Sequence, residues 1–157
     1  MADRKVVIFK LGNESYGVNI DTVRGIEKVL PVVRIPNSVP YIQGIINLRG
    51  SIIPVLSLRN RFGLPDVPDT DRTEFLVTTV GSTVLALKVD EMDSIYDLRT
   101  AQIFETPLIV RTPETAYMDE VLLLEDRRLV IVLNTNELLS RQEKEAVERM
   151  LEEQNKK

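Results

Sequence analysis

The sequence predicts a mainly β protein, in which short strands form barrels or a sandwich and one α-helix follows near the C-terminus. Three observations lead to this prediction. A strand–turn–strand pattern occurs twice, further short apolar runs follow at close spacing, and the last part of the chain changes to helical spacing. The 157 residues are enough to bury a core, and we expect them to form a single domain over 1–157. No apolar run is long enough to span a membrane, and the N-terminus lacks a leader pattern, so we expect a cytoplasmic protein without direct membrane insertion.

The strand–turn–strand pattern occurs at residues 11–26 and again at residues 80–95. "LGNESYGVNIDTVRGI" aligns with "VGSTVLALKVDEMDSI" without a gap, so every matched pair lies 69 positions apart. Gly12 and Gly81 supply turn residues that can take a positive φ, and each following strand is apolar at every second position. We interpret the pattern as a repeated supersecondary unit, and two unrelated hairpins with similar patterning are the alternative.

Five further apolar runs predict strands: GIINL, SIIPVL, SIYDL, EVLLLE and RLVIVL. Arg49 and Gly50 separate the first two runs and are a tight-turn signal, so we expect a hairpin with Arg49 near its tip and Asn47 just behind. Ser57 then begins a short helical turn, and the segment 65–73, rich in proline and aspartate, follows as a linker between the two halves.

The C-terminal part of the chain predicts a helix over about 136–154. Ser140 and Glu143 have the spacing of a capping box. Apolar residues then recur at helical spacing, opposite a glutamate-rich face. We expect the apolar face to pack on a barrel, and a helix that docks a partner is the alternative.

Composition excludes several kinds of catalytic and metal site. The chain contains no histidine and no cysteine, which removes Ser-His-Asp and Cys-His nucleophiles, thiolate ligands and the usual zinc sites. We therefore expect neither a metal nor a cofactor. The alternative is a small enzyme or a ligand-binding regulatory module that uses the carboxylates of Asp90, Glu91 and Asp93. Because Asp90 repeats Asp21 at the matched position, a structural role at the end of each hairpin explains Asp90 better.

Charge is spread unevenly along the chain. Residues 1–64 contain nine Lys or Arg and four Asp or Glu, a net charge of +5, so residues 65–157 carry −9 of the total of −4. This asymmetry indicates an acidic partner for the first half, and scattered solvated charges are the alternative. Nucleic acid is not expected as a partner, because the basic residues do not form runs.

Arg49 is the candidate binding residue that the physical chemistry of the hairpin suggests. A guanidinium offers five donors in a fixed fork, suited to carboxylates or to backbone carbonyls at the end of a helix. The alternative is that Arg49 is merely an exposed turn residue, and the residues alone favour that alternative.

The segment "YIQGIINLRGSIIPVLSLRNRFGL" (41–64) resembles the signature stretch of the CheW family, the bacterial chemotaxis coupling proteins. "FKLGNESYGVNIDTV" (9–23) also resembles that family, and the similarity runs over nearly the whole chain. The resemblance implies two intertwined five-stranded SH3-like β-barrels, with approximate subdomains 14–83 and 1–13 plus 84–157 if strands are exchanged. It also implies a non-catalytic adaptor that joins the cytoplasmic tip of chemoreceptors to the regulatory domain of the histidine kinase CheA. Such an adaptor is recruited to membrane receptor arrays through its partners.

The resemblance also implies which residues contact these partners. The receptor side carries over to Arg49, with Asn47 and Leu48 beside it. The kinase side carries over to Val23, Ile26 and Gly44. This chain departs from the family at Gly25, where many members carry an acidic residue, and has Glu27 further along. If that acid forms a pair in other members, the pair must move or be absent here.

Overall fold

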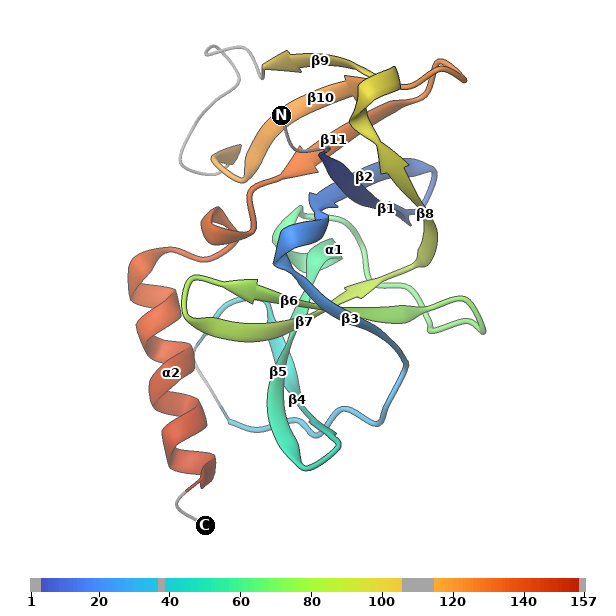
Figure 1. The fold of residues 1–157 in the computed structure, drawn as a ribbon. Coiled ribbons are helices and arrows are strands. Elements are labelled where there is room, and N and C mark those ends of the chain that lie inside the picture. Colours follow the sequence, from blue (N-terminus) through green and yellow to red (C-terminus); the bar gives the residue numbers. More distant parts are fainter. Residues whose placement is uncertain (1–3, 37–38, 106–114, 156–157) are drawn as a thin grey trace.

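The computed structural model describes residues 4–36, 39–105 and 115–155, which form two β-sheets and one long helix (Figure 1). In spatial order, sheet A contains β8 (Glu91–Asp97), β1 (Lys5–Leu11), β2 (Glu14–Asn19), β11 (Leu129–Leu133), β10 (Met118–Leu123) and β9 (Gln102–Glu105). Sheet B contains β3 (Val23–Lys28), β6 (Glu74–Val80), β7 (Thr83–Val89), β5 (Ser51–Ser57) and β4 (Ile42–Leu48). The prediction of a mainly β fold is confirmed.

Short helical elements connect the strands. They include α1 (Leu58–Arg61) and the 3-10 turns η1 (Ile20–Thr22), η2 (Leu98–Thr100) and η5 (Thr135–Glu137), and α2 (Arg141–Asn155) follows η5. α1 lies between the two sheets (Figure 1). In the part of the chain that the structure describes, no helix is both long and apolar enough to cross a membrane.

The two copies of the sequence repeat have the same element order, β1–β2–β3 and β6–β7–β8. Each begins with a hairpin whose two-residue turn contains a glycine in the left-handed region, Gly12 at φ 61° and Gly81 at φ 63°. After each hairpin the chain crosses to the other sheet, so that β3 pairs with β6 and β8 pairs with β1. The predicted supersecondary repeat is therefore confirmed, and its third strand is exchanged between the sheets.

The crossings fix which residues belong to each sheet. The chain leaves sheet A at 20–22 and returns to it at Asp90, a few residues after the subdomain boundaries implied by the resemblance. The division into subdomains itself stays a prediction. Among the described residues both sheets are open, with β8 and β9 at the edges of one and β3 and β4 at the edges of the other. The segment after β3 nevertheless reaches β4, because Val33 and Ile45 exchange two backbone hydrogen bonds of 2.8 and 2.9 Å.

One apolar cluster joins both sheets to α2. It contains Phe9 and Tyr16 from sheet A, Leu76 and Leu87 from sheet B, and Val147 from the helix. Two smaller clusters lie within the separate sheets. The apolar face of α2 is thus buried in the shared core, as the helical spacing predicts, and it is not left as a docking surface.

The predicted capping box of α2 is present. The Ser140 N–H donates to Glu143 Oε1 at 2.7 Å, and the Glu143 N–H donates to Ser140 Oγ at 3.1 Å. The helix begins at Arg141 rather than near 136, because Asn134 accepts a hydrogen bond from the Asn136 N–H and so caps the separate turn η5.

Candidate protein-binding site

The β4–β5 hairpin presents Arg49 at its tip. Leu48 pairs with Ser51, so Arg49 and Gly50 form a two-residue turn. Both have positive φ angles, 50° and 90°, as in a type I′ turn. Asn47 Oδ1 accepts a hydrogen bond of 2.8 Å from the Gly50 N–H. The polar residues within this apolar run thus have local roles: Asn47 stabilises the turn, and the turn projects Arg49.

The Arg49 side chain pairs with Glu27 of β3. Nη2 donates to Glu27 Oε1 at 2.6 Å, while the arginine side chain stays 72% exposed and the glutamate 22% exposed. An ion pair this open to water contributes about 0–1 kcal/mol to stability. The pair joins the β4–β5 hairpin to the opposite edge of sheet B, and it leaves further N–H donors on the guanidinium.

A groove of about 580 Å³ lies beside this ion pair. Its lining combines a charged rim with an apolar floor, and comprises Arg24, Gly25, Glu27, Leu48, Arg49, Ser51, Ile52, Ile53, Val77 and Val84. The groove was not predicted from sequence, because Glu27 and Arg49 lie 22 positions apart and meet only through the curvature of sheet B.

Val23 and Ile26 lie on the face of β3 opposite to that of Glu27. A register shift at Arg24 places Val23 opposite Thr78 and Ile26 opposite Leu76, so both side chains share one face despite their spacing of three. Val23 packs against the core cluster shared by the two sheets, and Ile26 is 42% exposed. The structure therefore separates the two predicted sets: Leu48 and Arg49 line the groove, whereas Val23 and Ile26 face the boundary between the sheets.

Gly44 is buried in β4 for a steric reason. A Cβ at this position would lie 2.3 Å from the backbone oxygen of Val33, which crosses directly over it. Only glycine permits this approach. Its predicted contact with the kinase stays a prediction.

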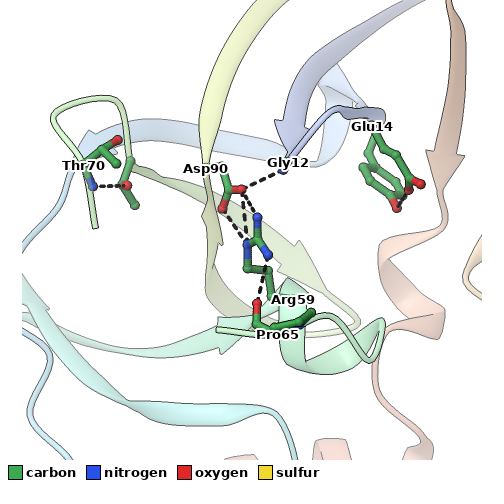
Figure 2. Close-up of polar contacts among 8 residues, drawn as sticks. Gly12, Glu14, Arg59, Pro65, Thr70 and Asp90 are labelled. Atoms are coloured by element: carbon green, nitrogen blue, oxygen red, sulfur yellow. Dashed lines mark hydrogen bonds and ion pairs between the residues drawn. The ribbon is translucent and has the colours of Figure 1, made fainter. Parts of the chain in front are cut away.

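The three candidate carboxylates do not converge on a common site. Asp90 pairs with Arg59 (Figure 2), Glu91 with Arg72, and Asp93 with Arg128. Within the described ranges no group of three metal-ligating side chains occurs.

The environment of Asp90 also favours its ionised form. Partial burial alone would raise the pKa of Asp90, but hydrogen bonds from Arg59 and from the Gly12 N–H outweigh it, and the net pKa is lowered. A carboxylate with a lowered pKa is a poor proton-transfer group near neutral pH, so Asp90 fits the predicted structural role.

The fold and this site define a mainly β protein whose candidate site is a contact surface formed by a hairpin tip and a neighbouring strand. The family model described as the CheW-like domain matches residues 5–143. The chain belongs to the CheW family.

Individual relatives agree with this assignment. The probable chemotaxis protein CheW of Rhizobium etli is 32% identical over 144 residues, covering 92% of both chains. The chemotaxis protein CheW of Klebsiella aerogenes is 34% identical over 140 residues, covering 89% of this chain and 84% of the relative. The crystal structure of the scaffolding protein TtCheW from Thermoanaerobacter tengcongensis matches with a TM-score of 0.75 at 28% identity, covering 88% of each chain.

Proposed function

We propose that this protein is a non-catalytic chemotaxis adaptor that couples the cytoplasmic tips of chemoreceptors to the regulatory domain of the histidine kinase CheA. The observation that carries the proposal is agreement with chemotaxis and scaffolding proteins of the CheW family over most of the chain. In the cell it acts in the cytoplasm, at receptor arrays to which its partners recruit it.

The separation of the two residue sets supports two distinct partner surfaces. Arg49 and Leu48 lie at the groove and provide the receptor side, where the guanidinium binds a carboxylate and the apolar floor accepts a side chain. Asn47 serves this side through the turn. Val23 and Ile26 provide the kinase side, with Gly44 beneath the crossing segment.

We further propose that each sheet is one of two intertwined SH3-like barrels. The bridge between Val33 and Ile45 brings the chain after β3 to the far edge of sheet B. Each sheet also has its own apolar cluster, as the interior of a barrel requires. The exchange of β3 and β8 gives the intertwining.

Calorimetric titration tests the function directly. The protein is titrated into an isolated CheA regulatory domain and, separately, into a receptor tip fragment. Saturable one-to-one binding in both titrations is the expected result, and no binding at high concentration would leave the family resemblance as a likeness of fold alone.

Arg49→Asn is the sharper variant for the receptor side. Asparagine before glycine favours the same type I′ turn, so the hairpin is retained while the guanidinium is removed. We expect receptor affinity to fall by roughly tenfold, as for one charge-assisted contact. Arg49→Glu, which also repels Glu27, should weaken binding further. Arg127→Asn is the matched control, since Arg127 is an exposed arginine with a positive φ of 72° in the β10–β11 connection. Equal losses in the two asparagine variants would contradict the assignment.

A further inference from the structure

Asp90 is the single residue between β7 of sheet B and β8 of sheet A. Its backbone N–H donates to the Lys10 carbonyl oxygen in β1 at 3.1 Å. Its Oδ2 accepts a hydrogen bond of 2.7 Å from the Gly12 N–H in the β1–β2 turn (Figure 2). Asp90 therefore binds the hairpin of sheet A at the point where the chain arrives from sheet B.

Arg59 binds the same carboxylate from the other side. It belongs to α1, which directly follows β5 of sheet B. Nε donates to Asp90 Oδ1 at 3.0 Å and Nη2 donates to Oδ2 at 2.5 Å, while Nη1 donates to the Pro65 carbonyl oxygen at 2.9 Å (Figure 2). The two side chains are only 16% and 25% exposed. This forked, half-buried contact holds geometry better than a solvated ion pair does. We call Arg59 and Asp90 the brace.

The other crossing between the sheets has no equivalent of the brace among the described residues. At the position matched to Asp90, Asp21 is exposed. The Gly81 N–H, matched to that of Gly12, donates to Asn136 Oδ1 of η5 at 2.7 Å. At this crossing Thr22 Oγ1 donates to the Asn19 carbonyl oxygen, and Thr78 Oγ1 donates to that of Thr22. The charged group beside it, Arg4, donates from Nε to Asn19 Oδ1 at 2.9 Å, and this contact stays within sheet A. The repeat is therefore asymmetric: among the described residues an ion pair lies at the Asp90 crossing, whereas a threonine hydroxyl ties the crossing at 20–22 to sheet B.

The crossing at 20–22 leads directly into the proposed kinase surface. β3 starts at Val23, which packs against the core shared by both sheets, and Ile26 lies exposed on the same face. We call this boundary between the sheets beside Val23 and Ile26 the seam. Any rotation of one sheet against the other changes the shape of the seam, whereas the groove beside Arg49 lies within sheet B and moves with it.

We propose that Arg59 and Asp90 are positioning residues: the brace fixes the angle between the sheets and so shapes the seam for the kinase. This inference rests on the proposed function, since it deepens the account of the kinase side. The inference distinguishes kinase binding from receptor binding, because breaking the brace alters the seam while the receptor groove keeps its geometry.

The test uses the full chain with Arg59→Gln, Asp90→Asn and Arg59→Lys. The asparagine still accepts the hydrogen bond from Gly12 but loses the charge, and the lysine keeps the charge but loses the fork. Glu120→Gln is the matched control, because Arg4 and Glu120 form an ion pair of 2.5 Å that joins segments of sheet A alone. The glutamine can still accept a hydrogen bond from Arg4, whose Nε also donates to Asn19 Oδ1 at 2.9 Å. Only variants whose circular dichroism spectrum matches that of the wild type are measured further. Arg59→Lys, which keeps the positive charge, is the least disruptive of the three substitutions.

Two readouts are measured on each variant. The chain has no cysteine, so spin labels at Ser51→Cys of β5 and Ser94→Cys of β8 report the distance between the sheets. Calorimetry on the same variants without the cysteine substitutions gives the affinities for the CheA regulatory domain and for the receptor fragment, because Ser51 lines the receptor groove. We expect the brace variants to broaden the distance distribution and to weaken kinase binding roughly threefold to tenfold, with receptor affinity within about twofold of wild type. Glu120→Gln should change neither readout.

Unchanged distances, or equal losses towards both partners, would overturn the inference. Absence of kinase binding by the wild-type chain would instead overturn the proposed function. In that case the spin-label distances still decide whether the brace fixes the angle between the sheets.

Discussion

Gly44 must be a glycine, because the backbone of Val33 occupies the space that a Cβ would need. We expect Gly44→Ala to lower the free energy of unfolding by about 2 kcal/mol, the usual cost of overpacking a filled site. Urea unfolding measures the change. Gly25→Ala is the control, since its Cβ would meet only the flexible Glu27 carboxylate at 3.9 Å. A loss at Gly25 as large as at Gly44 would contradict the steric explanation.

The lowered pKa of Asp90 predicts that the free energy of unfolding depends on pH, again through a single residue. Its pKa in the folded state is lowered from the ordinary value of 3.8, so folding favours the ionised form. The stabilisation is fully present above that value and is lost as the pH falls through the lower pKa of the folded state. The difference in unfolding free energy between wild type and Asp90→Asn should thus be constant above about pH 5 and shrink in acid. Thermal unfolding over a pH series measures this difference, and one that grows in acid would have the wrong sign.

At the scale of elements, the capping box makes α2 the clearest subject for a prediction. Ser140→Ala removes the acceptor for the Glu143 N–H, and we expect a loss of about 1 kcal/mol in the free energy of unfolding. Ser94→Ala provides the comparison, since Ser94 is an exposed serine in β8 without a side-chain hydrogen bond among the described residues. Urea unfolding gives the free energy of unfolding of both variants. Equal losses in Ser140→Ala and Ser94→Ala would mean that the cap does not stabilise the helix.

Elements could be predicted where their signals are local in the sequence. Gly12 and Gly81 mark the turns of two hairpins, and the pair Ser140 and Glu143 marks the start of a helix, because each signal depends on residues a few positions apart. The candidate site could be predicted only in part. The position of Arg49 at a turn could be predicted, but its pairing with Glu27 could not, since the contact depends on how sheet B curves. For the same reason the approach of Val33 to Gly44 left no sequence signal other than a glycine in a strand.

At the scale of the whole molecule, a shared core predicts cooperative unfolding. Aromatic side chains extend this core beside α1: Phe62, which directly follows α1, stacks on Tyr16 and on Tyr117, with ring centroids 5.2 and 4.7 Å apart. Arg61 lies over the Tyr117 ring at 4.5 Å and donates from Nε to the Leu138 carbonyl oxygen at 2.8 Å. Neither sheet can separate without breaking these contacts.

We therefore expect a single unfolding transition. The chain has no tryptophan, so tyrosine fluorescence reports the aromatic stack while far-ultraviolet circular dichroism reports the sheets. The two signals should change at one denaturant concentration, as a two-state domain requires. Separate midpoints would show that the sheets unfold independently.

The exchange of β3 and β8 has a consequence for protein synthesis. A ribosome releases the chain from the N-terminus at about 5–20 residues per second, and β1–β2 forms a hairpin early. Sheet A then lacks β8 until residue 97 has emerged and β11 until residue 133 has emerged. β3 likewise has no pairing strand until β6 follows. The first strands made are completed by nearly the last, so native folding ends only after most of the chain has been translated. A fragment cut at the linker 65–73 keeps the β1–β2 and β4–β5 pairs but cannot complete either sheet.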